Sequence, residues 1–380
     1  MILTEEMKAY LNASQEELKQ LIRDLCAIPA PSHHEEKRAA FCKEWFEANG
    51  GKGVYIDEAL NVVCPHHVKE GGPVVVFMAH TDTVFPDTEP MPFIETEETF
   101  QCPGVGDDTA NLAVMMICAR YFLQNDIKPN VGLLFIANSA EEGLGNLKGS
   151  RAIAKEYGSR MQALITFDGF RLYNVVNRAV GSHRYRVTVK TEGGHSFAAF
   201  GNRNAIAVLS SMISSLYSVK VPQEEGSKTT YNVGLISGGT SVNTIAQEAQ
   251  MLYEYRSDTK SCLAKMQDMF EKMVEAYRAT GVQIDVEKVG DRPCAGNVDP
   301  QAQNALEAMA ADSICRVTGR EPVFRSGSTD CNIPLSLGIP SVCMGIIEAT
   351  GAHTRSETLY LSSLPGGSAL CMDFMCNYFN

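Results

Sequence analysis

The chain has 380 residues, of which 44% are hydrophobic and 21% charged, and its formal net charge at pH 7 is −12. This length exceeds what one hydrophobic core usually supports, so we expect two domains, and the negative charge argues against nucleic acid or a membrane as partner. With no apolar run near the roughly 18 residues of a membrane span, no signal-peptide pattern and no Cys-x-x-Cys spacing, we expect reduced thiols and a cytoplasmic location.

In chain order, the first predicted element is a helix opened by a capping-box pattern at Ser14 and Glu17. Four short apolar runs follow, and they are too short for helices and rich in β-branched residues. They span 74–79, 131–138, 163–167 and 339–345. We interpret them as buried strands of a mostly parallel sheet in a doubly layered α/β domain.

Histidines and acids follow these strands, where ligands gather in open α/β sheets. They are His80, Asp82, Glu141, Glu142, Asp168 and, after the last strand, His353. Asp107 and Asp108 stand where a Gly-rich loop meets a predicted helix. Singly, each residue would be read as capping or solvated. Taken together, several carboxylates in one cleft repel one another by about 4 kcal/mol per pair at about 4 Å and an effective dielectric of about 20. Cations must therefore offset this repulsion. Mixed histidine and carboxylate ligands suit zinc, manganese or cobalt.

The pattern changes in the middle of the chain. The segment 183–190 alternates polar and apolar residues, which is typical of a half-exposed antiparallel strand. A helix near 204–217, strands near 229–236 and 249–256, a helix near 263–280 and a final strand complete a split β-α-β-β-α-β pattern. We therefore predict a ferredoxin-like α+β domain, 180–293, inserted into a discontinuous catalytic domain, 1–179 and 294–380.

These motifs, taken as a set over nearly the whole chain, resemble the co-catalytic zinc amidohydrolases that include peptidase T, acetylornithine deacetylase, succinyl-diaminopimelate desuccinylase and glutamate carboxypeptidase. The resemblance implies two divalent metal ions, zinc before manganese or cobalt, with Asp107 as the bridging ligand and a cis peptide after it. One ion would be bound by His80, Asp107 and Asp168, and the other by Asp107, Glu142 and His353.

Catalytic roles also follow from the resemblance. Glu141 would be the general base that activates a metal-bridging water, and Asp82 would orient His80. The inserted domain would dimerise and act as a lid, with His195 reaching the partner's site to stabilise the oxyanion. Substrate would lie near Asn243, Arg256, Gly327, Ser328 and Thr329, and Glu357 would support the ligands. Without the resemblance, turn chemistry or surface ion pairs would explain His195 and the substrate-binding set.

The resemblance implies a peptidase T-like aminopeptidase or tripeptidase-like exopeptidase, because aspartate at the Asp168 position is more typical of aminopeptidases. One alternative is a deacylase of N-acyl amino acids. Another is a non-catalytic metal- or peptide-binding protein, although such a protein would not need Glu141. The remaining histidines, which do not share this strand-end context, are interpreted as surface or structural residues: His33, His34, His66, His67 and His183.

Overall fold

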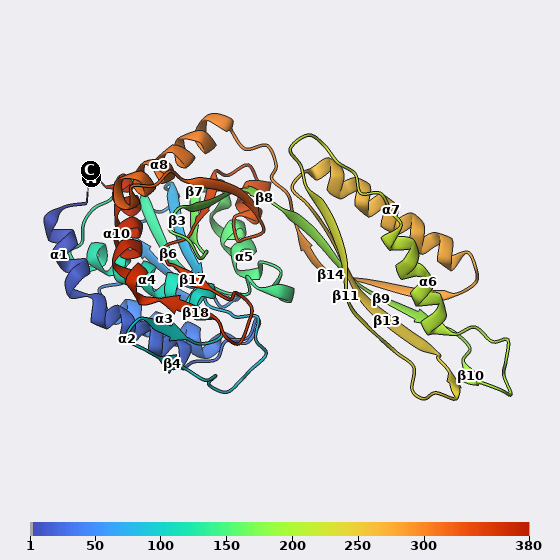
Figure 1. The fold of residues 1–380 in the computed structure, drawn as a ribbon. Coiled ribbons are helices and arrows are strands. Elements are labelled where there is room, and N and C mark those ends of the chain that lie inside the picture. The colour runs from blue at the N-terminus through green and yellow to red at the C-terminus, as the bar shows by residue number, and fades with distance from the viewer. Residues whose placement is uncertain (1–2, 380) are drawn as a thin grey trace. The chain divides into compact units, whose positions relative to one another are not determined.

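The structure is a computed structural model that describes residues 3–379. The chain divides into two compact units, one formed by Met1–Ala179 with Gly296–Asn380 and the other by Val180–Ala295. Figure 1 shows the chain leaving the first unit after β8 and returning to it before α8. The predicted domain limits lie close to this division.

An eight-stranded sheet forms the centre of the first unit, in the order β1-β2-β6-β3-β7-β16-β8-β15. The pairs β3–β6, β3–β7, β7–β16 and β8–β15 are parallel, whereas β2–β6 and β8–β16 are antiparallel. The mostly parallel sheet is thus confirmed. Its strands are β1 (Tyr55–Ile56), β2 (Val62–His66), β3 (Val74–His80), β6 (Gly132–Asn138), β7 (Met161–Phe167), β8 (Asn174–Ala179), β15 (Val323–Gly327) and β16 (Ser341–Met344).

Helices cover this sheet, and every residue of β3 and β6 is buried, as their continuous apolar sequences predict. The helices are α1 (Glu5–Ala13), α2 (Gln15–Cys26), α3 (Glu36–Ala48), α4 (Ala110–Gln124), α5 (Lys148–Tyr157), α8 (Pro300–Thr318), α9 (Asn332–Ser336) and α10 (Leu364–Met375). Short helical turns are η1 (Val105–Thr109), η2 (Gly143–Gly145), η3 (Gly158–Arg160), η4 (Leu361–Ser363) and η5 (Cys376–Tyr378). A small antiparallel sheet contains β4 (Ile94–Glu95), β5 (Thr99–Gln101), β18 (Thr358–Tyr360) and β17 (Ala349–Thr350).

The capping box predicted at Ser14 is wrong. Helix α1 ends immediately before Ser14, so this residue keeps a helical conformation, and its hydroxyl donates to the carbonyl of Tyr10 at 2.8 Å. Glu17, the other half of the predicted box, instead pairs with Arg120 of α4. The predicted box is therefore replaced by a local bond from Ser14 to Tyr10 and by an ion pair between α2 and α4.

The second unit is a four-stranded antiparallel sheet, in the order β11-β13-β9-β14, with α6 and α7 on one face (Figure 1). The split β-α-β-β-α-β pattern is confirmed. Tyr185, Val187 and Val189 are buried beneath the helices, as the alternating sequence predicts. The elements are β9 (Gly181–Lys190), β10 (Gly194–His195), α6 (Ala205–Tyr217), β11 (Thr229–Gly238), β12 (Thr244–Ile245), β13 (Glu248–Ser257), α7 (Lys260–Arg278) and β14 (Gln283–Arg292).

Among residues 3–379, no helix combines the length and the apolarity that crossing a membrane requires.

Candidate metal centre

The candidate site lies at the carboxyl ends of three neighbouring parallel strands. His80 is the last residue of β3 and lies beside Asn138, the last residue of β6. Glu141 and Glu142 follow β6, and Asp168 follows β7 directly. The parallel register therefore gathers residues that are far apart in the sequence at one sheet edge, as predicted from the strand ends.

Asp107 lies between two histidines. Its Oδ1 is 3.1 Å from Nε2 of His80, and its Oδ2 is 3.1 Å from Nε2 of His353. The same His353 nitrogen lies 3.3 Å from Oε1 of Glu142. Each oxygen of one carboxylate thus faces a different histidine, which is the arrangement that a carboxylate bridging two cations requires.

Two sets of three side chains can each place their ligand atoms within 4.8 Å of one another. One set contains His80, Asp107 and Asp168, and the other contains Asp107, Glu142 and His353. The sets coincide with the two predicted ligand groups, and the donor types fit zinc, manganese or cobalt. Glu141 lies close enough to His80 and Glu142 to form a third such group.

The site concentrates negative charge in a buried place. Burial and the Asp107 carboxylate raise the pKa of Glu142 to about 7 and raise that of Asp168 well above its usual value. Burial alone would raise the pKa of Asp107, but hydrogen bonds to His353 and His80 hold it below its usual value. Contact with Asp107 and Glu142 raises the pKa of His353 to about 10. In the absence of cations, bound protons must therefore neutralise part of the negative charge of these carboxylates.

These pKa shifts predict the pH dependence of the metal-free protein. Glu142 has a folded pKa of about 7 against 4.5 for the free side chain, so the folded state binds more protons between these values and loses stability as pH rises through them. His353 stabilises the fold fully below pH 6.5 and loses this contribution as pH rises toward 10. We therefore expect the Tm of the chelator-treated protein to fall by several degrees from pH 5 to pH 9.

Differential scanning fluorimetry at each pH measures this effect. The metal-loaded protein is the control, and its Tm relative to the metal-free protein should increase with pH because protons and metal compete for the ligands. A metal-free Tm that rises from pH 5 to pH 9 would contradict the assigned charges.

Asp82 supports both halves of the site. Its Oδ1 lies 3.4 Å from Nδ1 of His80 and accepts the main-chain N–H of Glu141 at 3.0 Å. Its Oδ2 accepts the N–H of Glu142 at 3.0 Å and the hydroxyl of Ser32 at 2.6 Å. The carboxylate thus lies near His80 Nδ1, although this nitrogen is closer to the main-chain carbonyl oxygen of Asp82, at 3.0 Å. The same carboxylate also fixes the Glu141–Glu142 loop.

Glu357 fixes the loop that carries Asp107. Its carboxylate accepts the N–H groups of Gly104 at 3.2 Å, Gly106 at 2.6 Å and Asp107 at 2.8 Å. Gly104 has a φ of 76°, and a Cβ there would lie 2.5 Å from the Thr83 side chain, so the turn requires glycine. The predicted cis peptide between Asp107 and the next residue is confirmed.

The supporting roles of several residues were not predicted. Asp108 accepts the N–H of His80 at 3.0 Å, and Asp330 accepts from the Asn138 amide at 2.6 Å. Glu35 accepts the N–H of Ala140 at 2.9 Å. Asp108 had a visible signal, its place beside Asp107, whereas the partners of Asp330 and Glu35 lie more than 100 residues away in the sequence.

The predicted oxyanion and substrate residues are distributed over both units. In the second unit, His195 on β10 lies opposite Thr244 on β12, and Thr244 is the residue that follows Asn243. Arg256, on β13, donates to both oxygens of Glu254 at 3.0 Å, so its guanidinium already has a carboxylate partner. In the first unit, Gly327 ends β15 and begins the segment with Ser328 and Thr329. Their substrate contacts stay predictions.

A mostly parallel sheet whose strand ends gather two histidines and several carboxylates defines the class: an α/β metallohydrolase. The chain belongs to Peptidase family M20/M25/M40, whose model matches residues 76–377. The resemblance inferred from the sequence motifs is confirmed. The protein is thus a metal-dependent hydrolase that acts on peptide bonds.

Three relatives illustrate the family. The chain is 23% identical to the succinyl-diaminopimelate desuccinylase of Pseudomonas syringae pv. syringae over 78% of this chain and 82% of that one. It shares the fold of the aminopeptidase PepT from Bacillus cereus, with a TM-score of 0.70, 22% identity and coverage of 95% and 97%. It also shares the fold of YXEP, a dinuclear metal-binding peptidase from Bacillus subtilis, with a TM-score of 0.63, 19% identity and coverage of 96% and 98%.

Proposed function

We propose that this protein is a two-metal exopeptidase that removes residues from the free amino end of short peptides, with Glu141 as general base. The observation that carries the proposal is the Asp107 carboxylate, whose two oxygens each face a histidine at 3.1 Å beside Glu141 and Glu142. The mixed ligands favour zinc as the metal. The expected cytoplasmic location also stays a proposal.

The two ligand sets would hold two ions, which when bound would polarise the amide carbonyl and lower the pKa of water so that hydroxide is available near pH 7. The protein supplies the proton transfers. Glu141 is buried, and its main chain is held by Asp82 at 3.0 Å, so its carboxylate keeps a defined place beside the ligands. It accepts a proton from the attacking water and donates it to the leaving amine, so one carboxylate serves both steps.

The substrate class separates this proposal from its alternative. The aspartate at position 168 and the likeness to the aminopeptidase PepT support a free-amino peptide. The likeness to a desuccinylase supports the other candidate, a deacylase of N-acyl amino acids. Both would use the same water and the same Glu141, so among the residues of the centre only the aspartate at position 168 favours one candidate over the other.

Turnover of matched substrates tests the proposal. The zinc-loaded protein is assayed with free-amino di- and tripeptides and with the N-acetyl and N-succinyl forms of the same amino acids. We expect hydrolysis of the free-amino peptides, abolished by chelation and restored by zinc. Hydrolysis of the blocked substrates alone would overturn the exopeptidase assignment in favour of the deacylase.

We also propose a homodimer formed through the second unit, with His195 completing the partner's site as an oxyanion donor. Strand β11 is an edge of its sheet, and its Leu235 and Ile236 are 46% and 52% exposed. Phe197 and Phe200, close to His195, are 89% and 91% exposed. An open edge with apolar side chains is a natural surface for pairing with a second copy.

Substitution at the edge strand tests the dimer. We expect Leu235→Lys to shift the protein from dimer to monomer, because a buried lysine at the pairing edge would lose its hydration. Sedimentation velocity measures the mass, and Gln283→Lys on the opposite edge strand β14 is the control. A monomeric parent, or a Leu235→Lys variant as dimeric as the parent, would contradict this interface.

A further inference from the structure

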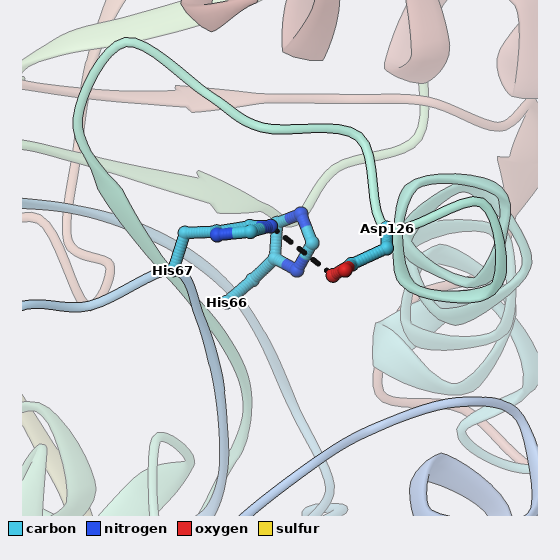
Figure 2. A group of neighbouring side chains, drawn as sticks. All are labelled: His66, His67 and Asp126. Carbon is cyan, nitrogen blue, oxygen red and sulfur yellow. Dashed lines mark ion pairs between the residues drawn. The ribbon is translucent and has the colours of Figure 1, made fainter.

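A second group of side chains that could bind a metal ion lies at the opposite end of the strands of the central sheet, where β6 begins. His66 ends β2, His67 follows it, and Asp126 lies in the connection between α4 and β6 (Figure 2). Because β2 runs antiparallel to β6, His66 pairs with Leu133 near the start of β6, whereas Glu141 follows the end of that strand. The length of β6, roughly 20 Å at about 3.3 Å per residue, separates this group from the catalytic centre.

The His66 ring is fixed in the form that binds metals. It is 5% exposed, and its Nε2 lies 2.7 Å from the carbonyl oxygen of Ile127. A carbonyl oxygen accepts only, so Nε2 carries the proton and Nδ1 presents a lone pair. A metal-binding histidine commonly donates its other ring N–H to a carbonyl in this way.

His67 and Asp126 complete the group. Nε2 of His67 lies 3.2 Å from Oδ1 of Asp126, close to the separation of about 3.4 Å between two ligands of a tetrahedral zinc ion. The rings of His66 and His67 are 4.5 Å apart between centroids and nearly perpendicular. One ligand atom from each of the three side chains lies within 4.8 Å of the other two, and Figure 2 shows the side chains converging.

The surroundings leave room for an ion. The three side chains line a cavity of about 220 Å³ together with Lys52 and Leu123, and this volume also accommodates water ligands. The Lys52 ammonium is 4.0 Å from Oδ1 of Asp126, beyond hydrogen-bond distance, and its side chain is 82% exposed. This lysine can therefore turn into solvent when another cation binds.

We propose that His66, His67 and Asp126 bind a divalent transition-metal ion of the zinc type, at a site separate from the catalytic centre. Two imidazoles and one carboxylate suit zinc, cobalt or nickel better than magnesium or calcium, and water supplies the fourth ligand. The bound ion joins the end of β2 to the connection before β6. The three residues thus have a role beyond the surface or structural one expected for the histidines from sequence.

Zinc titration of the metal-loaded protein tests this site. The catalytic centre is first saturated with zinc and the excess is removed by dialysis, and zinc chloride is then titrated by isothermal calorimetry at pH 7.5. We expect one additional site per chain, with affinity at least tenfold weaker in His67→Ala and in Asp126→Asn. The control is Glu70→Gln, which removes a neighbouring exposed carboxylate of the same charge and should bind like the parent.

Two results would overturn the proposal: the absence of an additional binding event in the parent, or variants that bind zinc as tightly as the parent. His67 and Asp126 are partly exposed, so their variants are expected to keep the parent's metal-free Tm, which confirms folding. The readout is zinc binding and not hydrolysis. A failure here is therefore distinguishable from a failure of the proposed peptidase function.

Discussion

Glu141→Gln is expected to reduce kcat by about 10²- to 10⁴-fold while both metal ions remain bound. The amide has nearly the same shape as the carboxylate, but it cannot accept a proton from water at neutral pH. The main-chain N–H of residue 141 still donates to Asp82, so the loop that carries Glu142 should keep its conformation. Steady-state kinetics with a free-amino dipeptide gives the rate, and elemental analysis gives the metal content.

Two further variants interpret this result. Glu44→Gln makes the same chemical change at an exposed position of α3 and should leave kcat and metal content unchanged. Glu141→Asp keeps a carboxylate, but its side chain is shorter by one methylene group, so we expect intermediate activity. If Glu141→Gln retains both ions and hydrolyses peptides within twofold of the parent rate, another group is the base.

The sequence predicts which candidate ligands lie together, because their proximity depends on one general property of parallel sheets. His80 and Asp168 each stand directly at the end of an apolar strand, and the structure brings both to the same edge beside Asp107. The register of β3 against β6 and β7 does this without any local signal at the ligands themselves. Recognising the buried strands was therefore sufficient to predict that two residues almost 90 positions apart in the sequence lie close together.

The supporting contacts are less predictable because they join distant segments through tertiary packing. Glu357 accepts from Gly104 and Gly106, more than 250 residues earlier, and nothing local in the sequence specifies which N–H groups it reaches. Asp82 was expected to orient His80, but its bonds to the Glu141–Glu142 main chain depend on the position of β6. The capping-box error has this origin only in part: Glu17 pairs with Arg120 of α4, about 100 residues away, whereas Ser14 bonds four residues back to Tyr10.

Asp107→Asn is expected to abolish the binding of both ions and to lower kcat/KM by about 10³-fold or more, because each ion contributes several kcal/mol to transition-state stabilisation. The amide side chain of this variant presents one neutral oxygen where the parent places two charged oxygens at 3.1 Å from His80 and His353. Asp168→Asn is the comparison. Asp168 belongs to only one ligand set, so its loss should weaken the binding of one ion and not of both.

The metal-free Asp107→Asn variant supplies an independent test of the contact between Asp107 and His353. In the parent, contact with Asp107 is the largest of the effects that raise the pKa of His353 to about 10, so the variant should titrate closer to the usual value of 6.5. Histidine nitrogen NMR of chelator-treated protein detects this change without any bound ion. A variant that binds two ions with parental affinity would contradict the bridging role, and an unchanged His353 titration would contradict the contact itself. Together the two measurements separate a carboxylate that joins two cations from one that merely pairs with two histidines.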